Sequence, residues 1–362
     1  MLSNRLLAFL LPGLALAGGI ASACTVPVFR YALDRWPADP YRLEAPAGWM
    51  EGKAGAGLRK FLDENRTELE VLPLAEAGAS ARLLMPEDGP VVWSGSLDEN
   101  ATALLESPVR RELARRILAG ESMVWVMVSS GDDRADRKFE GILNARLEYL
   151  QGVAAIPEQD PTDPESTLGP GPGLRVGFSF MKINRDDPEE QVFLRMLAGP
   201  QGELLEKEEP FGGVVFGRGR VLGAWPSSEL NEEGIDEVSL FLLGACSCRV
   251  KFQNPGWDLG IALDWDEALL AAQMEWEKKG DGDSEENDGG EPAPREDKEP
   301  ESRPEVVRIE GGGIPAGDEA DGERKRLKAH PAVGPVISVL VALTGVLAVC
   351  CLLRGRGGVK GS

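Results

Sequence analysis

A continuous apolar run at residues 122–129 constrains the fold of this chain more than any other feature. It consists of Ser-Met-Val-Trp-Val-Met-Val-Ser and contains no charged residue. A strand that is apolar on both faces has to be covered on both faces, which places it inside a sheet with helices on either side. The run therefore predicts an α/β fold in which residues 122–129 form a central strand.

The residues after this run alternate between helical and extended patterns. A helix is predicted at residues 134–150, where Phe139, Leu143, Leu147 and Leu150 form an apolar stripe. The later predicted elements are a strand at 174–183, a helix at 189–197, strands at 213–216 and 220–225, and a helix at 235–245. We therefore expect a mixed sheet flanked by helices within residues 122–273.

Residues 24–121 carry weaker signals for an N-terminal α/β region. The predicted elements are helices at 27–36 and 58–62 and strands at 41–45, 69–72 and 91–93. A further helix is expected to begin at Ser107-Pro108, because a capping residue followed by proline is a typical helix start. On the side of this helix away from its apolar stripe we expect four solvated arginines, namely Arg110, Arg111, Arg115 and Arg116.

The first 23 residues have the three parts of a secretory signal peptide. Arg5 is followed by an apolar run at residues 6–16 and by the small residues Ala21-Ser22-Ala23. The run is too short to cross a bilayer, so we expect cleavage after Ala23. Cys24 would then be the first residue, the position at which bacterial lipoproteins receive their lipid. Lipidation of Cys24 and simple cleavage both stay open, and simple cleavage is favoured.

A second apolar segment, residues 333–353, is long enough for one transmembrane helix and carries no charge. Basic residues flank it on both sides, so the distribution of positive charge does not decide its orientation. The signal peptide does, because it directs the export of the chain on its C-terminal side. We therefore expect a single-pass membrane protein whose globular region lies on the extracytoplasmic (periplasmic) side, with residues 354–362 as a cytoplasmic tail.

Residues 274–332 are dominated by Asp, Glu, Gly and Pro, and the last aromatic residue among them is Trp276. Such a segment buries too little apolar surface to offset the entropy lost on ordering. It is predicted to be a disordered acidic linker between the globular region and the membrane.

Charge and histidine content narrow the possible functions. The chain has 60 acidic and 39 basic residues, a net charge of −21, which disfavours nucleic acid as a partner. Its one histidine, His330, lies in the predicted linker, which excludes Ser-His-Asp and Cys-His catalysis in the globular region. Phosphate-binding and dinucleotide-binding glycine motifs are absent as well. No cofactor is expected, and an enzymatic role is disfavoured.

Three cysteines of the predicted exported region form the most suggestive chemical group: Cys24, Cys246 and Cys248. A disulfide from Cys24 to one of the other two would tie the N-terminus to the last helix, as exported proteins permit. A strained Cys246–Cys248 bridge would instead be easily reduced and redox-active. Three thiolates could also hold Cu(I) or zinc. The structural disulfide is the favoured hypothesis, and the other two stay open.

Two groups of acids are weaker candidates. Asp264 and Asp266 are predicted to share one face of a strand at the edge of the linker. Asp132, Asp133 and Asp136 lie at a helix N-terminus, where the helix dipole favours acids without any catalytic role. Neither group is a convincing acid/base pair.

The predicted order from residue 122 is strand, helix, strand, helix, strand, strand, helix. With residues 209–222, Glu-Pro-Phe-Gly-Gly-Val-Val-Phe-Gly-Arg-Gly-Arg-Val-Leu, this order resembles the thioredoxin superfamily. The resemblance covers residues 122–245 and implies a thioredoxin-like fold with Pro210 at the cis-proline position. The turn that carries Cys-x-x-Cys in that family reads Ser-Gly-Asp-Asp-Arg-Ala-Asp at residues 130–136. A thioredoxin-like member without its dithiol implies no activity.

Residues 24–36, together with Cys246-Ser-Cys248 and Asn254-Pro-Gly256, also resemble exported, membrane-anchored bacterial proteins, and this resemblance implies no activity. The function that the sequence favours is that of a non-enzymatic interaction protein, held at the membrane, with a protein partner in the cell envelope. The alternative is a thiol–disulfide exchange or soft-metal handling protein that uses Cys246 and Cys248.

Overall fold

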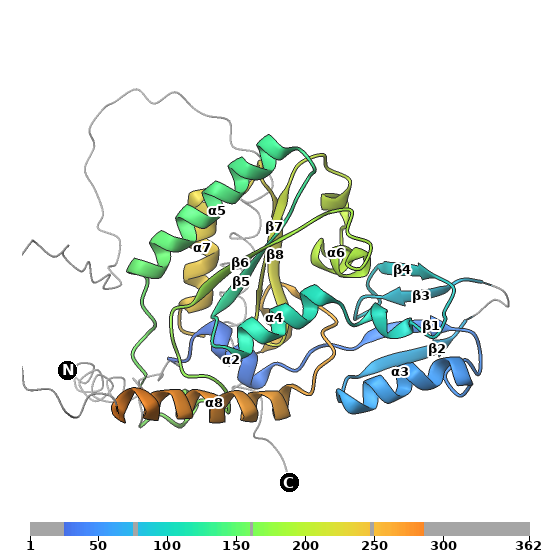
Figure 1. The fold of residues 1–362 in the computed structure, drawn as a ribbon, viewed down its shortest axis with the longest axis horizontal. Helices are drawn as coiled ribbons and strands as arrows, with labels where there is room; N and C mark the ends of the chain where they lie inside the picture. Colours follow the sequence, from blue (N-terminus) through green and yellow to red (C-terminus); the bar gives the residue numbers. More distant parts are fainter. Residues whose placement is uncertain (1–24, 75–78, 160–161, 247–249, 286–362) are drawn as a thin grey trace, which may run out of the picture. The chain divides into compact units, whose positions relative to one another are not determined.

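Two mixed sheets with helices packed on them make up the described part of the protein (Figure 1). The computed structural model describes residues 25–74, 79–159, 162–246 and 250–285. The predicted signal peptide, Cys24, Cys248, the linker beyond residue 285 and the predicted membrane segment 333–353 lie outside these residues. Within them, no helix combines the length and the apolar character that crossing a membrane requires.

The larger sheet has the strand order β6-β5-β7-β8-β9. Its strands are β5 (Met123–Val128), β6 (Phe178–Ile183), β7 (Phe211–Phe216), β8 (Arg220–Pro226) and β9 (Trp257–Asp258). β5 pairs with β6 in parallel and with β7 antiparallel, and β7, β8 and β9 are successive antiparallel neighbours. All residues of β5 are buried, so the predicted central strand is confirmed.

The two faces of β5 belong to two different cores, because successive side chains of a strand point to opposite faces. Met123, Trp125 and Met127 pack with α2 (Val28–Arg35), α5 (Asp133–Val153) and α7 (Glu232–Leu243). Val124, Val126 and Val128 share the other core with residues of α4 (Pro108–Leu118), α6 (Gln191–Leu197) and α8 (Trp265–Glu285). The predicted apolar stripe of α5 is buried as expected.

The smaller sheet has the order β2-β1-β3-β4, and its strand β4 lies beside α6 (Figure 1). Its strands are β1 (Tyr41–Ala45), β2 (Leu69–Pro73), β3 (Ala81–Leu84) and β4 (Val91–Gly95). α3 (Lys53–Glu64) connects the parallel strands β1 and β2. Leu43 and Leu83 belong to the same buried cluster as Val126, so the two sheets share a core. Short 3₁₀ helices complete the described elements: η2 (Ala101–Leu104), η3 (Pro164–Ser166), η4 (Glu203–Leu205) and η5 (Lys251–Gln253).

One strand prediction near the C-terminal end of the globular region is wrong. Asp264 and Asp266 do not share the face of a strand, because α8 begins at Trp265. Asp264 accepts a hydrogen bond from the Glu267 backbone N–H at 3.1 Å, so it caps the helix.

α8 also changes the predicted start of the linker. It continues to Glu285, so the boundary predicted at residue 274 falls inside a helix. Leu269 and Ala272 are buried in this helix, and the Arg175 guanidinium lies 5.7 Å from the Trp276 ring centroid. These contacts hold the helix against the globular region, which the acidic composition of the segment does not reveal.

The prediction of four solvated arginines on α4 is wrong for Arg110, whose exposure is 1%. Its guanidinium lies 5.5 Å from the Phe193 ring centroid and donates to the Leu104 carbonyl at 3.3 Å. Burial lowers the pKa of Arg110 to about 10. The sequence pattern missed this because the side chain fills the space between α4 and α6.

Pro210 lacks the cis peptide bond that the thioredoxin resemblance implies, since no peptide bond between described residues is cis. The trans form is the default for proline, favoured by about 0.5–1 kcal/mol. The backbone carbonyl of Pro210 accepts a hydrogen bond from the Ser227 N–H at 2.8 Å, which ties the entry of β7 to the end of β8.

Candidate functional site

In the turn after β5, side chains and backbone N–H groups of the turn form hydrogen bonds with one another. The buried Asp136 carboxylate accepts from the Ser130 N–H and from the Ser130 hydroxyl, both at 2.8 Å. It also accepts from the Gly131 N–H at 3.2 Å, while Asp132 caps α5 through the Arg134 N–H at 2.8 Å. Asp133 is an exposed first-turn acid. The acids predicted at this helix N-terminus therefore fix the local backbone, and the Asp136 oxygens are already engaged.

Of the three candidate cysteines, only Cys246 lies in the described residues, and it is buried. Its backbone N–H donates to the Val26 carbonyl at 2.9 Å, and the neighbouring residues Pro27 and Ala245 form an antiparallel bridge. The structure thus brings the start of the described chain to the end of α7, as the predicted disulfide requires. No cluster of three potential metal ligands occurs within residues 25–74, 79–159, 162–246 and 250–285.

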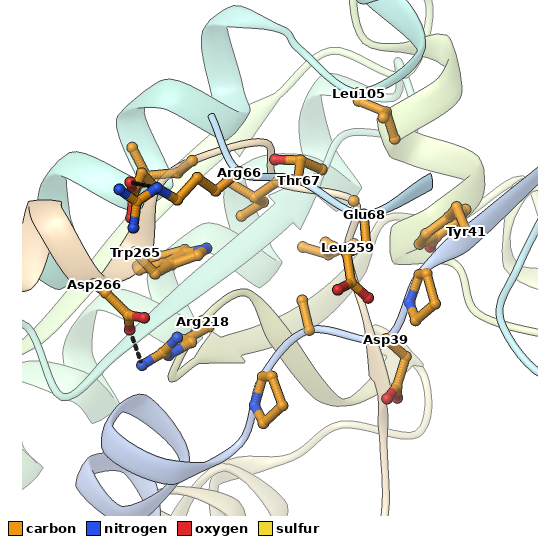
Figure 2. A pocket seen from close by; sticks show the side chains of 17 residues that line it. Asp39, Tyr41, Arg66, Thr67, Glu68, Leu105, Arg218, Leu259, Trp265 and Asp266 are labelled. Carbon is orange, nitrogen blue, oxygen red and sulfur yellow. Dashed lines mark hydrogen bonds and ion pairs between the residues drawn. The ribbon is translucent and has the colours of Figure 1, made fainter. Parts of the chain in front are cut away.

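A cavity of about 500 Å³ lies between the two sheets, and we call it the inter-sheet cleft (Figure 2). Five segments that are distant in sequence form its walls: the connection from α2 to β1, the turn between α3 and β2, the connection from η2 to α4, the turn between β7 and β8, and the segment from β9 into α8. The lining side chains include Ala38, Asp39, Tyr41, Arg66, Thr67, Glu68, Leu105, Arg218, Leu259, Ile261, Asp264, Trp265 and Asp266. The volume is in the range of cavities that bind small molecules or short peptides.

Leu105, Leu259 and Ile261 form the apolar part of this cleft, and all three are buried. Around it lie polar side chains, most of them from the connections that flank the strands of both sheets. An apolar floor with a few polar groups around it is typical of a binding cavity.

The arginines of the cleft are already neutralised. Arg66 forms an ion pair with Asp264 at 2.9 Å, and Arg218 forms one with Asp266 at 2.9 Å. Arg218 also donates to the Leu33 carbonyl at 2.8 Å, which fixes the turn between β7 and β8 against α2. The Asp264 carboxylate has a double role, since one oxygen caps α8 and the other holds Arg66.

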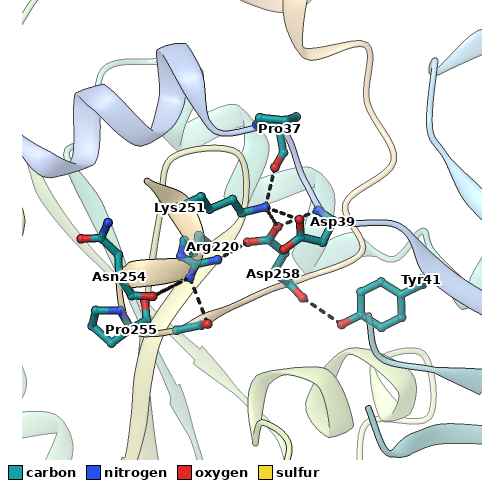
Figure 3. A network of polar contacts seen from close by, with 9 residues as sticks. Pro37, Asp39, Tyr41, Arg220, Lys251, Asn254, Pro255 and Asp258 are labelled. Atoms are coloured by element: carbon teal, nitrogen blue, oxygen red, sulfur yellow. Dashed lines mark hydrogen bonds and ion pairs between the residues drawn. The ribbon is translucent and has the colours of Figure 1, made fainter. Parts of the chain in front are cut away.

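A buried polar network supports one wall of the cleft (Figure 3). At its centre is Asp258, which is 3% exposed and forms an ion pair with Arg220 at 3.0 Å. The other Asp258 oxygen accepts from the Asp39 N–H at 2.7 Å and pairs with Lys251. Tyr41 donates its hydroxyl to the Asp258 carbonyl at 2.8 Å, and burial raises the Tyr41 pKa well above its usual range. The network therefore positions the two cleft residues Asp39 and Tyr41.

The Arg220 guanidinium completes this network on its other side. It donates to the backbone carbonyls of Asn254, Pro255 and Gly256 at 3.1, 3.2 and 3.1 Å. Gly256 has a φ of +107°, a conformation that a residue with a Cβ adopts only with strain. The Asn-Pro-Gly sequence thus forms a tight turn whose carbonyls point at one buried cation.

Sequence reasoning identified only the acids Asp264 and Asp266 among the cleft residues, and placed them on the wrong element. The signal for a helix was available, because an Asp directly before a helical apolar pattern is a typical N-cap. Asp39 and Glu68 belong to no motif, and the 209–222 segment that contains Arg218 implies no binding role for it. Tyr41 and Asp258 are joined across 217 positions of sequence.

Comparison with known proteins adds no assignment: no family model, no curated protein and no solved structure matches the chain.

Proposed function

We propose that this chain is a non-enzymatic interaction protein, held on the extracytoplasmic side of a membrane, that binds a protein partner of the cell envelope through the inter-sheet cleft. The proposal is based on the acidic side chains of the candidate sites, whose carboxylates are already engaged by other residues of the chain. The Asp136 carboxylate closes its own turn, and the cleft acids Asp264 and Asp266 are paired with arginines. Carboxylates whose oxygens are already held by hydrogen bonds or arginines suit recognition better than proton transfer, which needs a group that can reach a proton of the substrate. Export and anchoring rest on the sequence of residues 1–23 and 333–353.

The fold proposed for residues 122–245 is thioredoxin-like without the dithiol. Its support is the order of strands β6-β5-β7-β8, with a parallel β5–β6 pair and an antiparallel β7–β8 pair after the two helical connections. The trans bond at Pro210 departs from the family pattern. A scaffold of this kind carries no activity by itself, which agrees with a binding role.

A structural disulfide from Cys24 to Cys246 or Cys248 is part of the same proposal. It is supported by the contact between the backbone of Cys246 and that of Val26, two residues from Cys24. Burial of Cys246 disfavours the rival thiol–disulfide exchange, because reactive thiolates lie in partly exposed, electropositive surroundings.

The test of the proposed function is crosslinking of the full-length protein in native membranes, followed by affinity capture. We expect one or a few specific partners with the wild type and their loss with Ala38→Trp, which places a large ring in the cleft from an exposed backbone position. Ala271→Trp is the matched control, since Ala271 is exposed on α8 and does not line the cleft. Capture of no specific partner, or equal capture by Ala38→Trp, would rule out the proposal.

A further inference from the structure

We propose that the inter-sheet cleft binds a peptide segment through a primary ammonium group, supplied by a lysine side chain or by a free amino terminus. This inference rests on the proposed function and names the chemistry that the partner presents. It is based on the charges of the cleft, on an unpaired hydrogen-bond donor in its wall, and on its apolar floor.

Two carboxylates of the cleft, those of Glu68 and Asp39, have no ion-pair partner among the residues that line it, so the excess charge of the cleft is negative. Glu68 is exposed at the cleft and has no hydrogen-bond or ion-pair partner among the residues the structure describes. The Asp39 side chain is 41% exposed and contacts Lys251 at 2.9 Å. In Figure 2 the Glu68 and Asp39 carboxylates lie on the same side of the cleft, away from Arg66 and Arg218. A ligand ammonium beside the Glu68 carboxylate would gain a charge-assisted hydrogen bond, and the Asp39 carboxylate, which Lys251 already engages, adds negative charge on the same side of the cleft.

An unpaired donor lies in the cleft wall. Trp265 is 6% exposed, and its indole nitrogen has no hydrogen-bond partner in the described part of the chain. Figure 2 shows this nitrogen on the edge of the ring that faces Thr67 and Leu259. An indole N–H only donates, and a buried donor without an acceptor is unfavourable. A ligand with a carbonyl oxygen would supply the missing acceptor.

Ammonium and carbonyl together define a peptide better than a simple amine or an anion. Anionic ligands are disfavoured because both cleft arginines, Arg66 and Arg218, are already paired with aspartates. The apolar floor of Leu105, Leu259 and Ile261 fits the methylene stem of a lysine or a small apolar residue next to an amino terminus. The volume of about 500 Å³ accommodates a short segment and no folded domain.

The experiment is isothermal titration calorimetry of the full-length protein with four short peptides. Acetyl-Ala-Lys-Ala-amide offers a side-chain ammonium, Ala-Ala-Ala-amide offers a terminal one, and acetyl-Ala-acetyllysine-Ala-amide and acetyl-Ala-Ala-Ala-amide offer none. We expect one or both ammonium peptides to bind, and the two peptides without an ammonium group to bind at least about tenfold more weakly. Which ammonium peptide binds decides between the two sources.

Glu68→Gln should weaken binding of the ammonium peptide about fivefold, as the loss of one partly exposed ion pair predicts. Glu70→Gln is the matched control, because Glu70 is an exposed carboxylate of the neighbouring β2 and does not line the cleft. Equal binding of all four peptides, an unchanged affinity of Glu68→Gln, or no binding at all would overturn the inference. If membranes yield a partner that Ala38→Trp loses while the peptides do not bind, the proposed function survives and the ammonium specificity fails.

Discussion

Removing the charge at the centre of the buried network should destabilise the fold far more than the same change at its surface. The perturbation is Asp258→Asn, which keeps the size of the side chain and removes its negative charge. Asp258 is 3% exposed and faces Arg220 at 3.0 Å, with Lys251 on its second oxygen. The variant leaves the buried Arg220 guanidinium without a carboxylate.

Breaking a buried ion pair from one side typically costs about 3–5 kcal/mol. Here Arg220 keeps three backbone carbonyls, and Lys251 keeps Asp39 at 2.9 Å. Both remaining cations are therefore partly compensated, so we expect the low end of the range, about 3 kcal/mol. At about 2–4 °C for each kcal/mol in a region of this size, the midpoint of thermal unfolding should fall by about 6–12 °C.

The assay is thermal and urea unfolding of the full-length protein, followed by tryptophan fluorescence. Asp266→Asn is the matched control, because Asp266 pairs with Arg218 but its side chain is 74% exposed. We expect this control to lose less than about 1 kcal/mol. A loss below about 1 kcal/mol for Asp258→Asn, or equal losses for the two variants, would refute the assignment of the network as the support of the cleft wall.

Three further variants test other parts of the structure. Arg110→Met should change the free energy of unfolding by less than about 1 kcal/mol or increase it, because Arg110 is a buried cation that forms no ion pair with the residues that the structure describes. A loss above about 2 kcal/mol in urea unfolding would contradict this. Hydrogen bonds from Arg115 and Arg116 lower the pKa of Glu112 to about 2. The pKa of Glu112 is lower in the folded than in the unfolded state, so the wild type should be more stable than Glu112→Gln above about pH 4.5. This difference in stability should vanish as the pH falls towards about 2. A difference in melting temperature that does not depend on pH would refute this prediction. Gly256→Ala should lower the free energy of unfolding by more than about 2 kcal/mol, because the added Cβ would lie 2.1 Å from the Val221 carbonyl oxygen. Gly131→Ala should lower it by about 1 kcal/mol in the same urea assay, because its Cβ would have nothing within 4 Å.

The elements that the sequence predicts well are those whose signal is local. β5 is an uninterrupted apolar run, and the apolar stripe of α5 repeats at helical spacing. The start of α4 is signalled by Ser107, which accepts a hydrogen bond from the Arg110 N–H. β3 has no comparable signal, because only its alternate residues, Ala81 and Leu83, are buried, and this is too short a pattern to distinguish from a loop.

The candidate site could not be predicted in the same way, because its residues meet only through tertiary contacts. Asp39 contacts Asp258 across 219 positions, and Arg218 reaches Asp266 across 48. The residues next to them in the sequence do not indicate which distant residue each of them contacts. The burial of Arg110 has the same origin, since it depends on how α4 packs on α6 and not on the pattern of α4 itself.

Site-specific photo-crosslinking in native membranes tests the central claim most directly. A photoreactive phenylalanine analogue would replace either Ala38, at the inter-sheet cleft, or Ala271, on the exposed side of α8. A binding role for the cleft predicts a discrete crosslinked protein at position 38 and none at position 271. No adduct at position 38, or the same adducts at both positions, would contradict it.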